Sequence, residues 1–264
     1  MRKRLTWILV LGIALTSVFT AIALADSSTK LIVGELEVTI KGGFSPKKLP
    51  KKKLAPIHLR AGGAIDMKNG KHPPSLTEVI VETDKNGTVN ASGLAKCTAG
   101  KLVATTTKAA LKACGPALVG EGKTDVEIAF AEQEPFIAHS ELLAFNGGVS
   151  GGKTTIYIHA YLSNPVSAAV VTTVKVSKID SGRYGTKSVA TIPPIAGEGA
   201  VRKFQLEFFR TFTHKGKKQS YLLARCADGK LKARAKASLN DSAGGTGKIK
   251  TPEGELSFPC TPKG

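Results

Sequence analysis

The sequence predicts an all-β protein, built as an antiparallel β-sandwich or a barrel-like sheet with one short helix near residues 105–114. Two observations predict this class. Apolar and polar residues alternate with a period of two in five separate segments. Residues that favour tight turns separate those segments at fairly even spacing. Spacing of this kind predicts about 10–12 strands.

The first alternating segment covers residues 35–40, where Leu36, Val38 and Ile40 alternate with polar neighbours. Such a segment is a half-buried strand, because successive side chains point to opposite faces of a sheet. The same pattern recurs in residues 155–162, 170–177, 203–208 and 230–239. Asparagine, aspartate and glycine tolerate the positive φ of tight turns. We therefore expect turns at Asn69-Gly70, Asn86-Gly87, Asn146-Gly147 and Asp228-Gly229.

One segment has helical rather than strand character. Threonines at 105–107 can supply an N-cap hydroxyl, and residues 108–114 are rich in helix formers. Gly115 is expected to end the helix in a left-handed conformation, and Pro116 prevents its continuation. The sequence therefore predicts a helix of two to three turns, which needs tertiary support because short helices are marginal alone.

Residues 1–25 are predicted to be a secretory signal peptide. The positive residues Arg2, Lys3 and Arg4 precede an uncharged apolar run, and Ala23 and Ala25 form the small-x-small pattern of a cleavage site. Cleavage would fall between Ala25 and Asp26, leaving residues 26–264 as a single secreted domain. The alternative is an uncleaved N-terminal anchor, because the apolar run approaches the roughly 20 residues that span a membrane. No second apolar run of that length follows, so the expected location is extracellular or in the cell envelope.

The chain contains four cysteines, an even number that predicts disulfides in an exported protein. We expect the pairs Cys97–Cys114 and Cys226–Cys260, because each closes a local loop. The two other pairings and a four-cysteine zinc site are alternatives, although the CxxC spacing typical of such zinc sites is missing from the sequence.

Residues 147–154 match the phosphate-loop pattern GxxxxGK[ST], and residues 148–152 match the G-x-S-x-G pattern of hydrolases. Both patterns work only when a helix follows the loop. Here Lys153 is followed by a strand pattern rich in β-branched and aromatic residues. We therefore expect a glycine-rich hairpin loop at this position and no nucleotide site.

The remaining polar residues suggest no catalytic, metal or cofactor site. The five histidines do not occur at metal-ligand spacing, and the acidic residues are scattered. Glu35 and Glu37 share one strand face, but adjacent solvated glutamates are common. Tyr157, His159 and Tyr161 also share a face and form a candidate sugar-stacking platform.

The net charge of +18 at pH 7 indicates an affinity for polyanions. Two groups of cations are candidate binding residues. The first is a row on one face of one predicted strand, Lys230, Lys232, Arg234 and Lys236. The second is a loop cluster, Lys47, Lys48, Lys51, Lys52 and Lys53. The alternative is a solvated strand face that keeps an edge soluble. Specific nucleic-acid binding is not expected, because aromatic residues do not interleave with the row.

Three pairs of segments carry a resemblance to known sequences. They are residues 73–77 with 84–87, residues 93–97 with 113–122, and residues 182–185 with 221–226. Together they resemble a group of uncharacterised secreted proteins common in soil actinobacteria. The resemblance implies an exported, disulfide-bonded β-protein. The group has no assigned activity, so it assigns no functional residues here.

The sequence thus favours a secreted, non-enzymatic protein of the envelope or extracellular space, whose cationic residues bind an anionic wall polymer. Two alternatives remain. A secreted polysaccharide hydrolase would show a cleft with converging carboxylates of raised pKa. A structural surface module would have no ligand.

The leader gives a first testable prediction. N-terminal sequencing of exported material should find Asp26 as the first residue, because Ala23 and Ala25 fit the peptidase pocket. The mature protein should also lack tryptophan fluorescence, since the chain's one tryptophan, Trp7, leaves with the leader. Exported protein that retains Met1 would contradict this.

Overall fold

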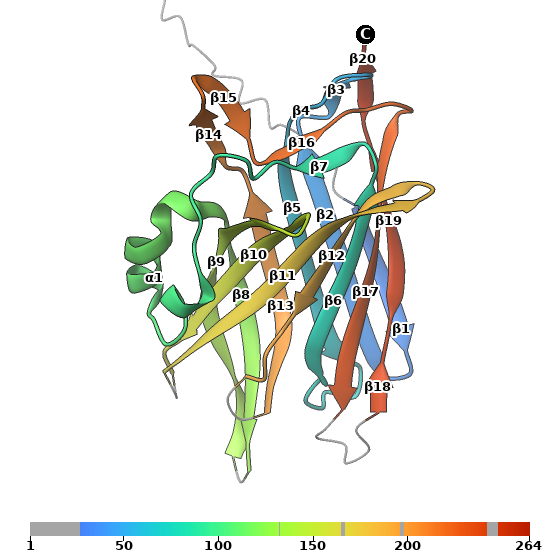
Figure 1. Cartoon of the computed structure of the whole chain (residues 1–264). Coiled ribbons are helices and arrows are strands. Elements are labelled where there is room, and N and C mark those ends of the chain that lie inside the picture. Colours follow the sequence, from blue (N-terminus) through green and yellow to red (C-terminus); the bar gives the residue numbers. More distant parts are fainter. Residues whose placement is uncertain (1–26, 132, 165–166, 196–197, 242–247) are drawn as a thin grey trace, which may run out of the picture.

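The computed structural model describes residues 27–131, 133–164, 167–195, 198–241 and 248–264 (Figure 1). The predicted leader, residues 1–25, and the cleavage site at Ala25 and Asp26 lie outside these residues. The all-β prediction is confirmed. Over the described residues the main element is a 13-stranded sheet with antiparallel pairing, nearly closed into a barrel.

Neighbouring strands of this sheet follow the order β1-β2-β5-β13-β8-β9-β10-β11-β12-β6-β17, and β17 also pairs with β18 and β19. Their bounds in chain order are β1 Ser27–Val33, β2 Leu36–Ser45, β5 His58–Met67, β6 Ser75–Asp84, β8 Leu118–Phe130, β9 Gln133–Ser150, β10 Lys153–Leu162, β11 Ala168–Ser181, β12 Tyr184–Thr191, β13 Glu198–Phe208, β17 Lys230–Asp241, β18 Lys248–Lys250 and β19 Glu253–Pro259.

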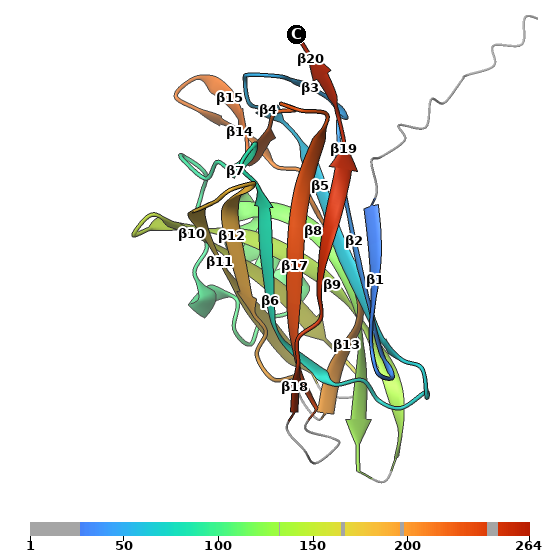
Figure 2. The ribbon, with the colours of Figure 1, turned by 90° about the vertical axis from the view of Figure 1, so that its right-hand side faces the viewer.

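The two ends of the sheet meet where β1 and β19 lie side by side, without strand pairing between their described residues (Figure 2). The hydroxyl of Thr29 donates a hydrogen bond of 2.8 Å to the carbonyl oxygen of Glu255. A β-carbon at Gly254 would lie only 3.2 Å from a side-chain methyl of Leu31. Glycine at this position therefore lets the two strands approach closely.

Period-two alternation decides which side chains enter the barrel. In β17, Leu231, Ala233, Ala235 and Ala237 are buried, whereas the lysines and the arginine between them are half-buried or exposed. The same parity holds in β11, where Val174 and Val176 are buried. Because one face of each strand is apolar, closing the sheet collects the apolar faces in the interior.

Short strands cover one end of the barrel, the upper end in Figure 1. Seven strands lie here, with the bounds β3 Lys48–Pro50, β4 Ala55–Pro56, β7 Gly87–Val89, β14 Thr211–His214, β15 Lys217–Ser220, β16 Leu222–Ala224 and β20 Thr261–Lys263. The sheet β4-β16-β7 forms what we call the lid. The pairs β14-β15 and β3-β20 flank it.

The helix α1 (Thr107–Cys114) is confirmed within the predicted range, and it covers part of the outer face of β9 and β10 (Figure 1). Thr106 is the N-cap, and its hydroxyl accepts a hydrogen bond from the backbone N–H of Ala109. The predicted left-handed cap at Gly115 is wrong. Gly115 has right-handed angles, φ −50° and ψ −42°, because the chain continues into the 3₁₀ turn Gly115–Ala117. A second 3₁₀ turn covers Ala99–Lys101.

The phosphate-loop lookalike is a hairpin, as predicted, but the turn expected at Asn146-Gly147 is wrong because β9 continues to Ser150. Lys153 is the first residue of β10, which pairs antiparallel with β9. Gly151 and Gly152 occupy the turn with φ of +54° and +73°. These angles suit glycine, and they account for the glycines without any phosphate ligand.

Both predicted disulfides are confirmed. The Cα atoms are 5.4 Å apart in Cys97–Cys114 and 6.0 Å apart in Cys226–Cys260. The first bond ties α1 to the segment before it, and the second joins the end of β19 to the chain just after β16 in the lid. Within the described ranges, none of the helices has the length and apolar character needed to cross a membrane.

The second disulfide should contribute more to stability than a surface contact would. Replacing Cys226 and Cys260 together with serine should lower the free energy of unfolding by about 3–4 kcal/mol, because the bond restricts the unfolded chain. Urea denaturation of the variant and the wild type measures the difference. A loss below about 1 kcal/mol, the size of an ordinary surface change, would refute this role.

Candidate functional site

The interior of the barrel contains a cavity of about 420 Å³. This volume lies within the roughly 300–1,000 Å³ that is typical of small-molecule sites. Inward-facing side chains of the main sheet form its walls, and residues of the lid close one end. Leu222 and Ala224 of β16 are among these lid residues.

The walls are mainly aliphatic. On β6, β10 and β11 the inward positions carry Val79 and Val81, Ile156 and Ile158, and Val174 and Val176. Val79, Val81 and Ile158 are only half-buried although they face inward. These inward side chains remain partly accessible because they border the cavity, which no side chain fills.

Small residues on two strands leave the space open. β17 presents Ala233, Ala235 and Ala237 to the interior, and β5 presents Ala61 and Gly63. Leucine or isoleucine at these positions would fill the centre, as in small barrels with packed interiors. This run of small inward residues is the sequence signal that could have predicted the cavity.

Several hydroxyls interrupt the aliphatic wall, among them Thr172 of β11, and three of them are grouped on two neighbouring strands. Thr83 on β6 and Thr186 and Ser188 on β12 line the cavity and are half-buried. Thr83 and Thr186 are direct partners across the two strands, and Ser188 is opposite Val81. Among the described residues, these hydroxyls have no hydrogen-bond partner.

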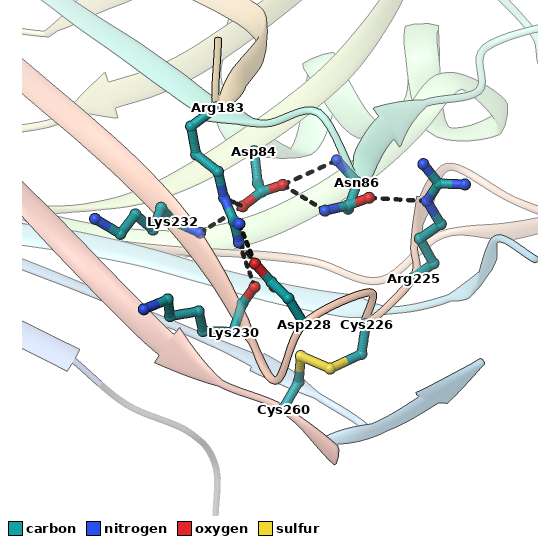
Figure 3. Close-up of a disulfide and its surroundings, with 9 residues drawn as sticks. All are labelled: Asp84, Asn86, Arg183, Arg225, Cys226, Asp228, Lys230, Lys232 and Cys260. Carbon is teal, nitrogen blue, oxygen red and sulfur yellow. Dashed lines mark hydrogen bonds and ion pairs between the residues drawn. A yellow bond between two sulfur atoms is a disulfide. The ribbon is translucent and has the colours of Figure 1, made fainter. Parts of the chain in front are cut away.

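Charged residues near the cavity point to the outer side of the wall, where Asp84, Arg60 and Lys232 have partners of opposite charge. The carboxylate of Asp84 accepts hydrogen bonds from Arg183 Nε at 2.5 Å and from the backbone N–H of Lys232 at 3.0 Å (Figure 3). It also accepts from the backbone and side-chain nitrogens of Asn86, at 3.0 and 2.9 Å. A buried carboxylate with this many donors is well compensated.

The Asp84 network continues into the lid. Arg225 Nε donates to the side-chain oxygen of Asn86 at 2.8 Å, and Arg225 precedes Cys226 of the second disulfide (Figure 3). Arg183 also forms a bidentate pair with Asp228. That hydrogen bonding raises the pKa of Arg183 and lowers the pKa of Asp228. The network therefore holds the lid, β12 and β17 together at one end of the cavity.

The predicted cationic row is present on the outer face of β17, but acidic neighbours pair with two of its members. Arg234 forms a salt bridge with Glu82 and lies 3.5 Å from Glu253. Lys232 Nζ lies 3.5 Å from Glu255. For Lys230 and Lys236, no salt bridge occurs with any described residue. The row is therefore a mixed-charge surface, because its strand lies between acidic positions of β6 and β19.

The lysine cluster is more exposed. Lys48, Lys51, Lys52 and Lys53 are exposed and Lys47 is half-buried, and no carboxylate among the described residues forms a salt bridge with them. The cluster lies at the lid end, beside β20 (Figure 1). Lys215, Lys217 and Lys218 form a separate cationic group on the β14-β15 hairpin.

The candidate sugar-stacking platform is wrong. His159 is fully buried under the segment that leads into α1, and its Nε2 lies 2.9 Å from the carbonyl oxygen of Thr105. Burial lowers the pKa of His159. Tyr157 packs against the buried cluster under the helix, so this face cannot accept a sugar ring.

The carboxylates Glu35 and Glu37 also form no joint site, because Glu37 makes a 2.6 Å salt bridge with Lys30. In the part of the chain that the structure describes, no three His, Cys, Asp or Glu residues are grouped closely enough to hold a metal ion.

Comparisons with known proteins leave the cavity to be interpreted on its own geometry. A scan against protein-family models, a search of curated proteins and a search of solved structures each found no match.

Proposed function

We propose that this protein is an exported, non-enzymatic binding protein that carries an apolar small molecule inside its barrel. The observation that supports the proposal is the cavity of about 420 Å³ with aliphatic walls. Burying apolar surface contributes about 25 cal/mol per Å². An apolar ligand of matching size therefore gains affinity from every wall of this site.

The expected extracellular location is consistent with a carrier of apolar molecules. Two disulfides are compatible with an oxidising, extracellular environment. In water outside the cell, an apolar molecule aggregates or partitions into surfaces because its hydration is unfavourable. A barrel with an apolar interior and a polar outer face keeps such a molecule dispersed.

The hydrolase alternative has less support than the carrier. A hydrolase needs carboxylates that converge on a cleft, one of them with a raised pKa. The Asp84 carboxylate, beside the cavity wall, is already engaged by Arg183, Asn86 and the N–H of Lys232. The pKa values of Asp228 and Glu255 are lowered by hydrogen bonds from Arg183 and Tyr184. Lowered values suit structural carboxylates rather than general acids.

Binding of an anionic wall polymer is a second candidate function, favoured by the exposed lysine cluster at residues 47–53. Exposed cations without neighbouring acids raise the local positive potential and attract polyanions. The row on β17 has weaker support, since Lys232 and Arg234 already have acidic partners. The two functions use different surfaces and are compatible in one protein.

Filling the cavity should abolish ligand binding. The wild type should bind the apolar dye N-phenyl-1-naphthylamine with increased fluorescence. Ala235→Phe should weaken this binding at least about tenfold, because the ring occupies the cavity. Lys236→Phe is the matched control, since the next residue points outward, and it should bind like the wild type. Circular dichroism should show that both variants are folded. A folded wild type that does not bind the dye would refute the carrier function.

The polymer proposal is tested by salt-dependent retention on purified wall material. Replacing Lys47, Lys48, Lys51 and Lys52 with glutamine should reduce retention and flatten its salt dependence, because exposed charges release counterions on binding. Replacing the four row residues instead is a control of equal charge change and should have a smaller effect. Equal effects of the two variants would show that only net charge matters.

A further inference from the structure

We infer that the ligand is a neutral amphiphile, with an aliphatic chain and one hydrogen-bonding oxygen such as an alcohol or an ester, and that Thr83, Thr186 and Ser188 bind this oxygen. The inference rests on the proposed carrier function and names its ligand class. Three observations support it: where the hydroxyls lie, how the chain directs them inward, and where the charges lie.

The three hydroxyls are close to one another on the inner face of two paired strands. Thr83 and Thr186 are opposite residues, and opposite β-carbons lie about 4.5–5.5 Å apart in antiparallel pairs. Ser188 is two residues along β12 from Thr186, which is about 7 Å. One oxygen of a ligand can therefore be reached from more than one of these side chains.

Thr186 faces the cavity in regular alternation with Ser188 and Ala190, and a β-bulge separates it from the outward Tyr184. The register of β12 with β6 shifts between Tyr184 and Thr186. Tyr184 faces outward, where its hydroxyl donates to Glu255 Oε1 at 2.6 Å and its ring stacks under Arg234. Without the shift, residues 184 and 186 would share one face. A β-carbon at Gly185 would lie 2.7 Å from Lys85 Cα, so the intervening glycine is required for this close approach.

These hydroxyls face the cavity without a partner among the described protein residues, so a molecule inside the cavity has to supply their hydrogen bonds. A hydroxyl in an apolar environment without a partner is destabilising. Valine has nearly the shape of threonine and would fit an aliphatic wall without this penalty. Among the described residues no group satisfies the three hydroxyls, so a ligand oxygen is the partner that the arrangement fits.

The charge distribution excludes an anionic head group. The charged residues at the wall direct their side chains outward, as Lys232 does toward Glu255 and Arg60 toward Glu207. Lys41 and Lys236 alternate with inward residues and share that outward parity. A carboxylate in the cavity would therefore meet no cation among the described residues, and an unpaired buried charge is strongly unfavourable.

The position of the hydroxyls also orients the ligand. Thr83 precedes Asp84, whose carboxylate accepts a hydrogen bond from Asn86. Asn86 comes directly before the lid strand β7. The oxygen of the ligand would thus lie near the lid end. Its chain would extend toward the other end, where Leu76, Leu162 and Ile195 line the cavity.

A matched pair of ligands tests the inference on the full mature protein. 1-Dodecanol and dodecanoate have chains of equal length, and displacement of N-phenyl-1-naphthylamine measures the affinity of each. At pH 8 the alcohol should bind at least about tenfold more tightly than the ionised acid. The triple variant Thr83→Val, Thr186→Val, Ser188→Ala should lose about tenfold in affinity for the alcohol, as expected when hydrogen bonds are removed. Its affinity for the dye should stay within about twofold.

Thr173→Val is the control, because Thr173 lies on the opposite face from the cavity-lining Thr172 of β11. It should leave the affinity for both ligands unchanged. If the dye binds but dodecanoate equals the alcohol, or the triple variant keeps its alcohol affinity, the ligand class is wrong and the carrier function stands. If the wild type does not bind the dye, both proposals are overturned.

Discussion

The contact between β1 and β19 is the interaction on which the interior depends. A twisted sheet of this size has one apolar face that must be covered, and closure lets the face cover itself. The hydrogen bond from Thr29 to Glu255 and the close approach at Gly254 bring the two edge strands together. Closure also protects both edges, which would otherwise be exposed to pairing with other chains.

Once the sheet is closed, side-chain size decides whether the interior is filled. The alanines of β17 and the small residues of β5 leave a space that larger aliphatic residues would occupy. The lid then limits access at one end, and the Asp84 network with the disulfide Cys226–Cys260 keeps it in place. Charge is held on the outer face and at the lid, while the interior has hydroxyls as its polar groups. This separation is what makes a neutral ligand a better fit than an ion.

Much of the fold could be predicted from the sequence, because period-two alternation is a local property. The pattern of residues 230–239 gave the correct inward and outward faces of β17, and short sequence separation gave both disulfides. The ion pairing of the cationic row could not be predicted in the same way. Its acidic partners Glu82, Glu253 and Glu255 belong to other strands, which become neighbours only through the sheet topology.

The cavity itself depends on still longer-range properties. The small inward residues of β17 indicate space in the interior, but the volume of the cavity follows from how β1 meets β19, which no local pattern encodes. Tyr184 faces outward because of a one-residue register shift, whereas simple alternation with Thr186, Ser188 and Ala190 would assign it to the inner face. The burial of His159 depends on where α1 packs, so its apparent place in an aromatic row was misleading.

The most direct test of the empty apolar interior is a crystal structure of the mature protein under xenon pressure. Dry apolar cavities bind xenon, whereas polar cavities hold ordered water. Xenon should occupy the barrel interior beside Val81 on β6 and its cross-strand partner Ala235 on β17, with the barrel otherwise unchanged. A barrel whose interior is closed by side chains, or filled by a connected water network, would contradict the account.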